Sequence, residues 1–557
     1  MTDPLAPRMR WWGWGVDGHD APLPAAAAAL LRDELGAGGA RVTPVALAHV
    51  ELAEPALAPT ARAQLAAAVG GEQHVRDDRL TRVTHAAGRS YPDLLRLRAG
   101  IGLTAPDAVV YPAGHDEVAA VLAVCAQQKI AVVPFGGGTS VVGAIEALRG
   151  QCTAAISLDL ARLSGLHALD ARSQLATFGA GTLGPDLERL LAEHDLTLGH
   201  FPQSFEFSTV GGWAATRSAG QASTGYGRID ELVVALRAAT PSGELSTLPV
   251  PASAAGPELR ELLLGSEGVL GVITEVTLRV RPRPRHQRYD AYSLPGFAAG
   301  TEALRELEQA GAAPDVARLS DEDETRMSLA LASHAAATRL LRAYMNARAR
   351  RGRQAQDPDH RPAGCLTILG FDGDADQIAR RRARARRILR RHGAVALGPA
   401  PAAAWVTGRF HGAYVRDELM SRGVLVDTLE TATTWTGLTK LHRDIRSAIT
   451  QALAARGTPA VVMCHVSHLY PTGASLYFTF LARQQPGAAL AQWQVAKQAA
   501  SEAISQAGAT ITHHHAVGRD HAAWLPAEVG PLGIAALRAV KERLDPAGIM
   551  NPGKLIA

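Results

Sequence analysis

Three consecutive glycines, Gly136 to Gly138, restrict the folding of this chain more than any other feature. They belong to the segment PFGGGTS, which follows the apolar residues IAVV at positions 130–133. Glycines supply no side chain to a core, but they let the backbone turn sharply and direct successive N–H groups at an anion. Thr139 and Ser140 add hydroxyl donors beside these amides. The pattern predicts a strand that ends in a pyrophosphate-binding loop; for the glycines alone, a flexible surface loop is the alternative.

Length and composition favour two or three domains, each with its own core. The chain has 557 residues, of which 47% are hydrophobic and 20% are charged. No stretch of about 18 apolar residues and no N-terminal signal region occur, so we expect a cytoplasmic protein without a membrane span. The net charge of +4 suits an anionic substrate or a lipid surface and does not indicate nucleic acid. Four widely spaced cysteines without a CxxC pair favour reduced thiols over disulfides or zinc: Cys125, Cys152, Cys365 and Cys464.

The pattern along the chain changes three times. Residues 1–100 are rich in Ala and Leu and are predicted to be mostly helical, whereas residues 101–284 alternate β-branched runs with helical patterns. An Arg/Pro linker ends that region. Residues 285–508 are predicted to form a cap with a helix over 379–392 and strands over 365–371 and 475–481, followed by a C-terminal segment over 509–557. Alternating strands and helices predict a mixed α and β protein.

Three further patterns suggest ligand sites but favour structural roles. GAGTLG at 179–184 fits G-x-G-x-x-G, yet the preceding strand is short and polar and no suitable acidic residue follows. The arginine run at 380–391 spreads its charge around a helix, which predicts a solvated face; an anionic membrane surface is the alternative. In the sequence CHVSH, strand spacing places His465 and His468 on opposite faces, so we predict no metal site there.

Three segments after the glycine loop also offer amides and hydroxyls: QSFEFSTVGG at 203–212, TRSA at 216–219 and GSEGVLGVI at 265–273. Together with PFGGGTS they resemble the FAD-binding domain of the vanillyl-alcohol oxidase family, and the tail DPAGIMNPGK resembles the C-terminal segment of such flavoproteins. The resemblance implies that PFGGGTS holds the pyrophosphate while the other segments wrap the flavin. Because the loop carries no histidine, we predict non-covalent FAD. The implied FAD-binding residues are Pro134, Phe135, Gly136, Gly137, Gly138, Thr139, Ser140, Gln203, Ser204, Phe205, Glu206, Phe207, Ser208, Thr209, Thr216, Arg217, Ser218, Ala219, Glu267, Gly268, Val269, Leu270, Gly271, Val272 and Ile273.

A wider resemblance covers almost the whole chain. WWGWG near the start, AYVRDEL, LETATTW and HHHAVG resemble, in this order, motifs of the alkyldihydroxyacetonephosphate synthase family. It implies an α+β fold: a PCMH-type FAD-binding domain, an α/β cap domain and a short C-terminal segment that returns to the flavin.

The implied activity exchanges the acyl chain of acyl-dihydroxyacetone phosphate for a fatty alcohol, in ether lipid synthesis, with FAD and without net redox change. The expected partner is therefore a small lipid-phosphate substrate, while peripheral membrane contact and a homodimer are left open. A flavin dehydrogenase or oxidase for a 2-hydroxy acid such as D-lactate or glycolate is the alternative, because that group shares the NPGK tail. A flavoprotein that binds without turnover is the third hypothesis.

The same resemblance implies roles for the histidine run. His514 is the expected base for the C1 proton of the substrate, supported by His513 and His515, since imidazole titrates near neutrality. On a short strand, His513 and His515 would share one face and His514 would point the other way. An incidental run and a metal site are the alternatives. Ala516 stands where the family usually has glycine, which is expected to alter the turn after the histidines.

Three side chains of the cap complete the expected site. Tyr477, in the alternating segment SLYFTF, is implied to donate a proton to the departing carboxylate, with sheet packing as the alternative. Arg416 is implied to clamp the phosphate, a task that suits a planar and always charged fork, and Arg318 is implied to assist it. Surface ion pairs are the alternative for both arginines.

Overall fold

The computed structural model describes residues 5, 8–37, 41–331 and 364–556, and in it the run IAVV lies in the buried strand β3 (Ile130–Phe135). This strand is the last in a four-stranded sheet of order β1-β2-β4-β3, with β1 (Val75–Arg76), β2 (Ala108–Val110) and β4 (Ala154–Asp159). β2, β4 and β3 are parallel, and α5 (His115–Gln128) connects β2 to β3. Strands buried on both faces read as continuous apolar runs, and the glycine loop begins where β3 ends.

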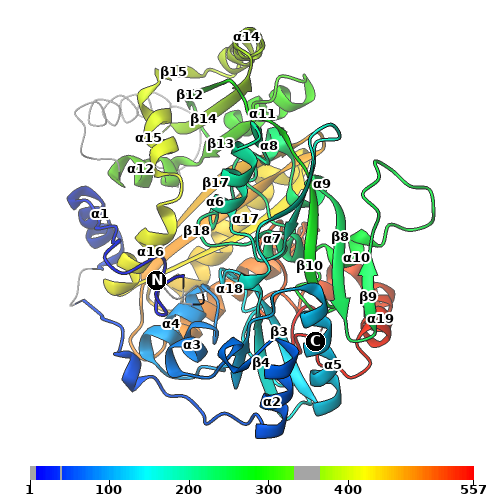
Figure 1. Ribbon diagram of the computed structural model, residues 1–557. Helices are drawn as coiled ribbons and strands as arrows, with labels where there is room; N and C mark the ends of the chain where they lie inside the picture. The colour runs from blue at the N-terminus through cyan, green and yellow to red at the C-terminus, as the bar shows by residue number, and fades with distance from the viewer. Residues whose placement is uncertain (1–4, 6–7, 38–40, 332–363, 557) are drawn as a thin grey trace.

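A five-stranded antiparallel sheet lies beside it (Figure 1), in the order β5-β6-β10-β8-β9. Its strands are β5 (Leu166–Asp170), β6 (Leu175–Gly179), β10 (Val272–Arg279), β8 (Val233–Thr240) and β9 (Gly243–Ser246). The accompanying elements are η3 (Leu160–Arg162), α6 (Gly184–Ala192), α7 (Val210–Thr216), α8 (Ser223–Tyr226), α9 (Ile229–Leu232), α10 (Arg260–Leu263) and the pair β7 (Leu196–Thr197) and β11 (Arg281–Pro282). A Cβ atom at Gly181 would collide with the carbonyl of Leu160, so GAGTLG has a packing role, as predicted.

The seven-stranded antiparallel sheet has the order β15-β12-β14-β13-β17-β18-β16. Its strands are β15 (Val395–Gly398), β12 (His286–Leu294), β14 (Cys365–Gly373), β13 (Val316–Ser320), β17 (Ala460–Tyr470), β18 (Gly473–Arg483) and β16 (Val424–Thr434). The strands predicted over 365–371 and 475–481 are confirmed as parts of β14 and β18. The helices of this region are α11 (Phe297–Gln309), α12 (Glu322–Leu331), α14 (Ala375–Arg391), α15 (Ala400–Gly408), α16 (Gly412–Ser421), α17 (Trp435–Ala454) and α18 (Ala489–Gln506).

Helix α14 confirms the helix predicted over 379–392 and explains its arginines. Ile378, Ala385, Ile388 and Leu389 are buried on one side, so the helix is anchored by an apolar stripe. Two arginines next to that stripe pair with carboxylates, Arg381 with Asp315 at 2.8 Å and Arg382 with Asp290 at 2.5 Å. Most of the other arginines are exposed, as expected for a solvated face.

The first hundred residues contain fewer helices than their composition suggested. The described ones are α1 (Ala25–Leu35), α2 (Pro59–Ala68), α3 (Arg79–Thr84), α4 (Tyr91–Ala99) and the short η1 (Leu47–His49) and η2 (Glu72–His74), with long irregular stretches between them. The helix propensity of alanine is worth less than about 1 kcal/mol per residue, so tertiary contacts can hold an alanine-rich segment in an irregular conformation. No described helix is both long and apolar enough to span a membrane.

The C-terminal segment explains the motif DPAGIMNPGK. After α19 (Leu525–Leu544) the chain runs beside β3, where Asn551 N donates to the Val132 carbonyl at 2.9 Å and Val132 N donates to the Ile549 carbonyl at 2.8 Å. The Asn551 amide then donates to the carbonyls of Ala144 and Glu267, at 3.1 and 2.7 Å. The tail therefore ties the glycine-loop strand to the segment GSEGVLGVI, and the C-terminus lies near β3 and α5 in Figure 1.

We expect the isosteric change Asn551→Asp to destabilise the protein. It would place a carboxylate against two buried carbonyl oxygens and leave both acceptors unpaired, at a cost of about 2–3 kcal/mol. Urea denaturation measures the loss. The matched control is Gln309→Glu, which removes an exposed amide contact to the Pro471 carbonyl and should stay within about 0.5 kcal/mol of the wild type. Equal effects of the two changes would contradict this account of the tail.

Candidate active site

A cavity of about 1360 Å³ lies between the glycine loop and the seven-stranded sheet. Its walls come from the end of β3, the start of α7, the residues before β10, the helix α16 and the strands β17 and β18. An apolar arm extends from it between α1, α12 and α15, lined among others by Leu23, Ala27, Leu31, Met327, Leu331, Leu366, Ile368, Ala404 and Trp405. The cavity thus has both polar and apolar walls.

The glycine loop forms a cradle that only glycine can make. A Cβ atom at Gly136 would collide with the Thr209 hydroxyl, and one at Gly137 would collide with the Phe207 carbonyl. Gly138 has a φ of +67°, a conformation that other residues rarely adopt. Thr209 in turn caps α7 by accepting the Gly212 N–H. Amides, hydroxyls and a helix N-terminus therefore converge on the cavity, and this arrangement fits the diphosphate of FAD.

Most of the expected FAD-binding residues line this cavity: Pro134, Phe135, Gly136, Gly137, Gly138, Thr139, Ser140, Gln203, Ser204, Ser208, Thr209, Thr216, Ser218, Ala219, Glu267, Gly268, Gly271 and Ile273. Seven others do not: Phe205, Glu206, Phe207, Arg217, Val269, Leu270 and Val272. Within this second group, Val269, Leu270 and Val272 are buried. The glycine loop therefore faces the cavity along its whole length, whereas the three later segments do so only in part.

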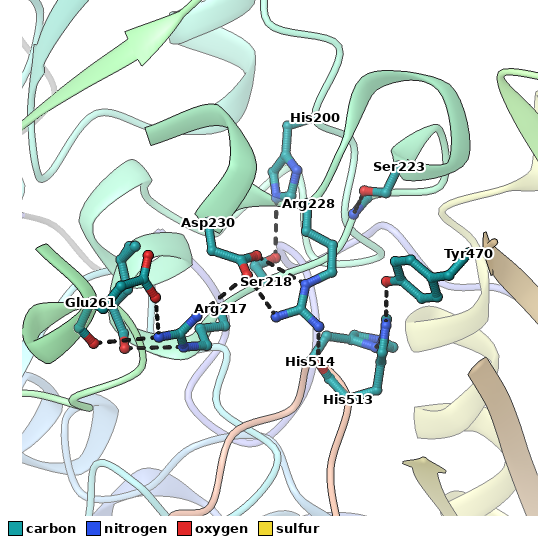
Figure 2. Close-up of polar contacts among 12 residues, drawn as sticks. His200, Arg217, Ser218, Ser223, Arg228, Asp230, Glu261, Tyr470, His513 and His514 are labelled. Atoms are coloured by element: carbon teal, nitrogen blue, oxygen red, sulfur yellow. Dashed lines mark hydrogen bonds and ion pairs between the residues drawn. The ribbon is translucent and has the colours of Figure 1, made fainter. Parts of the chain in front are cut away.

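Arg217 acts as a structural link rather than a cavity residue. Its guanidinium pairs with Glu261 at 2.6 Å and with Asp230 at 3.3 Å (Figure 2). Asp230 also holds Arg228, whose Nη1 donates to the carbonyl of His513 at 3.0 Å. The network therefore connects the flavin domain to the histidine run, and the direct contact with FAD that the motif implied for Arg217 is not supported by this geometry.

The histidine run lies in a loop, not on a strand, and the predicted alternation of its side chains is wrong. His514 and His515 both line the cavity, whereas His513 is buried and does not line it. The Nε2 atom of His513 lies 2.6 Å from the Tyr470 hydroxyl, and its Nδ1 lies 2.9 Å from Nδ1 of His514. Both contacts are visible in Figure 2. Every polar group of His513 is thus engaged with the protein.

Ala516, at the position where glycine was expected, adopts a conformation that favours glycine. Its φ is +72°, in the left-handed region, and its side chain is buried. For a residue with a Cβ atom this conformation costs roughly 1 kcal/mol. The surrounding hydrogen bonds of the loop hold the residue there.

Burial decides the charge states of the histidines. It lowers the pKa of His513 and of His514 to about 3, and the pKa of His515 to about 4, so all three are neutral at pH 7. Glu430 shows the opposite balance. Burial alone would raise its pKa, but attraction to the adjacent histidines in their protonated form and hydrogen bonds from the loop amides hold that pKa well below its usual range. One ionised carboxylate therefore lies among neutral imidazoles.

The two histidines of CHVSH also point in directions that differ from the prediction. A register shift in β17 between Val466 and Leu469 breaks the alternation, so His465 and His468 both line the cavity. The ring of His468 stacks on that of His513 with centroids 5.1 Å apart. Ring nitrogens of His468, His513 and His514 lie within 4.8 Å of one another and could hold a metal ion. Since both ring nitrogens of His513 already have protein partners, an ion would have to displace one of them.

The two expected arginines both face the cavity, in different electrostatic settings. Arg318 is neutralised by Glu324 at 2.8 Å and contacts His465. Burial would raise the pKa of Glu324, but the charge of Arg318 outweighs it and lowers that pKa to about 2. Arg416 is buried, and its Nε has no hydrogen-bond partner in the described structure. A cavity-lining guanidinium with a free donor of this kind is suited to an anionic ligand.

Tyr477 lies between the two histidine groups. Its ring stacks on His465 at 4.8 Å and lies parallel to His514 at 6.0 Å. Burial raises the pKa of Tyr477 to about 12, so its phenol is protonated at neutral pH. It can therefore donate a proton into the cavity that it lines.

Comparisons with known proteins agree with this geometry. Residues 106–249 match the family model of the FAD binding domain, and residues 283–555 match that of FAD linked oxidases, C-terminal domain. Alkyldihydroxyacetonephosphate synthase of Dictyostelium discoideum is 34% identical over 487 residues, which span 86% of this chain and 78% of the relative. The chain belongs to the alkyldihydroxyacetonephosphate synthase family. The Trypanosoma brucei brucei synthase is 32% identical over 87% of this chain and 79% of its own. A solved synthase structure superposes with a TM-score of 0.84 at 29% identity, covering 98% of both chains.

The opening motif WWGWG of this synthase-family chain holds the helix that carries Arg416. The N–H of Trp14 donates to the Asp417 carboxylate at 2.6 Å, and Arg10 bridges the Trp14 carbonyl and Asp417. A Cβ atom at Gly13 would collide with that carboxylate. The N-terminal WWGWG segment therefore fixes the position of Asp417 and, through it, of the neighbouring Arg416.

Sequence reasoning missed several residues that the synthase fold brings to the histidine loop. These are Glu430, Arg228 and Tyr470, and also His468, which the sequence analysis had set aside. Glu430 lies within the quoted motif LETATTW, but nothing in that motif shows which distant segment its carboxylate meets. Each of the missed contacts joins residues far apart in the chain.

We expect Gly137→Ala to abolish flavin binding, because the added methyl group would force the cradle away from the Phe207 carbonyl. Visible absorbance of the purified protein measures bound FAD, and circular dichroism reports whether the protein is folded. The control is Gly114→Ala, where a Cβ atom would meet open space. A folded G137A protein with full flavin content would contradict the assignment of the cradle.

We also expect the free energy of unfolding to decrease as the pH falls below 6.5. His521 is buried, and burial lowers its pKa to about 3, so between pH 6.5 and 3 the unfolded chain binds the extra proton. His521→Asn should therefore reduce the loss of unfolding free energy between pH 7.5 and 5.5 by about 1 kcal/mol. Urea denaturation at both pH values tests this against the exposed control His49→Asn. Identical losses in H521N and in the wild type would be inconsistent with a neutral buried His521.

Proposed function

We propose that this protein is an FAD-dependent synthase that exchanges the acyl chain of acyl-dihydroxyacetone phosphate for a fatty alcohol. The observation that carries the proposal is the buried, partly unpartnered guanidinium of Arg416, which shares one cavity with His514, Tyr477 and the apolar arm. In this cavity Arg416 can bind a phosphate, His514 can accept a proton, Tyr477 can donate a proton, and the apolar arm can hold an alkyl chain. Family membership supports the same activity.

In the proposed reaction Arg416 binds the phosphate and so orients the three-carbon unit. Arg318 contributes less net charge because Glu324 offsets it, so we assign it to positioning the substrate near His465. The apolar arm takes the acyl chain and later the alcohol, since it is lined mainly by aliphatic and aromatic side chains. These contacts would hold the reacting carbon beside the histidine loop.

In this proposal, side chains of the protein carry out both proton transfers. The neutral imidazole of His514 accepts the C1 proton, and the phenol of Tyr477 protonates the departing fatty acid carboxylate. FAD, held without a covalent bond by the glycine cradle, supplies an electron-accepting ring for the exchange and is not reduced overall. We extend the proposal to peripheral contact with a membrane, because substrates with long chains reside in bilayers.

The test incubates the purified yellow protein with acyl-dihydroxyacetone phosphate and a fatty alcohol, presented in phosphatidylcholine vesicles. We expect release of one fatty acid per alkyl-dihydroxyacetone phosphate formed, without reduction of an electron-accepting dye. Acid precipitation should release the flavin, and pelleting of the protein with the vesicles would support membrane contact.

Arg416→Gln should raise KM for the phosphate substrate by at least tenfold, because it removes the charge that binds the anion. Arg380→Gln on the exposed face of α14 is the control. Dye reduction with D-lactate or glycolate, together with no product from the lipid substrate, would overturn the proposal in favour of a 2-hydroxy acid dehydrogenase.

A further inference from the structure

Three carboxylates from three different elements hold the segment 510–518, which carries the histidine run. Glu528 of α19 accepts the Thr510 hydroxyl and the Ile511 N–H, at 2.7 and 2.9 Å. Glu267 accepts the N–H groups of Val517 and Gly518, at 2.8 and 2.7 Å. Glu430 of β16 binds the middle of the segment between these two.

Glu430 makes more contacts than the other two carboxylates. It accepts the backbone N–H groups of His513, His514 and His515 in succession, and the Thr512 hydroxyl at 2.7 Å. Its side chain is 1% exposed, so water does not screen its charge. A carboxylate that satisfies three consecutive amides fixes the backbone of the loop and stays ionised.

The same carboxylate also lies close to two imidazole rings. Nδ1 of His514 lies 3.5 Å from Glu430 Oε2, and Nδ1 of His515 lies 3.8 Å from Oε1. Nδ1 of His514 is also 2.9 Å from Nδ1 of His513, so one of these two nitrogens must donate and the other must accept. A negative charge beside Nδ1 of His514 favours the proton on that atom, which leaves Nε2 of the same ring as the acceptor.

We propose that Glu430 is the positioning residue that keeps His514 in the tautomer protonated on Nδ1, and that it offsets the positive charge formed when Nε2 accepts the substrate proton. This inference rests on the proposed function, in which His514 is the base. In that step the C1–H bond breaks and an Nε2–H bond forms, so the ring becomes an imidazolium. Glu430 remains a carboxylate throughout and gains no proton.

Other charged and titratable groups also face His514, and they do not duplicate this role. The positive charge of Arg228 opposes protonation of the ring, as do the neighbouring histidines when they are charged. The groups that the described structure places around this ring are Arg228, His200, His465, His468, Tyr477, His513 and His515, together with Glu430, the carboxylate that acts on it most strongly. Asp230, a second carboxylate that acts on the adjacent His513, is paired with Arg217 and Arg228. The stabilisation of an imidazolium at this position therefore depends mainly on Glu430.

The first test separates the effect of the charge of Glu430 from the effect of its side-chain length. Glu430→Gln keeps the volume but loses the charge, whereas Glu430→Asp keeps the charge on a shorter chain. We expect kcat of E430Q to fall about a hundredfold or more with little change in KM, and E430D to retain clearly more activity than E430Q. Glu528→Gln is the control: it removes a carboxylate of α19 that binds the start of the same segment at Thr510 and Ile511 and has no described contact with the imidazole rings, so it should keep the wild-type kcat.

The second test does not depend on turnover. In protein labelled with [15N]histidine and loaded with FAD, the Nε2 signal of His514, identified by its loss in H514N, should show an unprotonated nitrogen. In E430Q the same signal should move toward that of a protonated nitrogen, while E528Q should match the wild type. Should E430Q not fold, E430D provides the comparison, because it should keep the wild-type tautomer.

Two results would overturn the inference: a kcat of E430Q within twofold of the wild type, or an unchanged tautomer of His514 in E430Q. Equal losses in E430Q and E528Q would also count against it, since they would mean that the carboxylates only hold the loop. A wild-type protein without synthase activity, but with the tautomer shift in E430Q, would refute the proposed function and leave the role of Glu430 intact.

Discussion

The buried carboxylate of Glu430 is the main polar contact between the seven-stranded sheet and the histidine loop of the C-terminal segment. It binds three successive amides of the histidine loop, and its charge is not screened by water. Without such a partner the loop would leave several buried N–H groups unsatisfied, each at a cost of about 1–3 kcal/mol. The same contact fixes the imidazoles that face the cavity, so the architecture and the chemistry of the site depend on one charge.

Both ends of the chain are used to build the cavity. The N-terminal WWGWG segment holds α16 and with it Arg416, through the contact of Trp14 with Asp417. The C-terminal NPGK segment runs along β3 and holds the glycine cradle and the loop around Glu267. A site assembled from such distant segments forms only when the whole chain has folded, which explains why motifs are spread over almost the entire sequence.

Local sequence patterns predicted the elements well wherever one physical preference dominated. The apolar run before the glycines became β3, and the arginine-rich run became the amphipathic helix α14. The failures have specific causes. The register shift in β17 turned His465 and His468 to the same side, and hydrogen bonds to Glu430 replaced strand geometry at the histidine run. Arg217 was expected at the flavin from its motif alone, but it pairs with Asp230 and Glu261 instead.

The sequence by itself determined the glycine cradle, because three residues without side chains permit the close backbone contacts that a diphosphate site requires. It also determined the family, through motifs that occur in a fixed order. Only the tertiary structure decided which charges compensate one another: Glu324 offsets Arg318, Glu430 supports the histidines, and among the described residues the Nε of Arg416 has no hydrogen-bond partner. Electrostatic pairing depends on distance in space and on burial, and neither quantity can be read from positions along the chain.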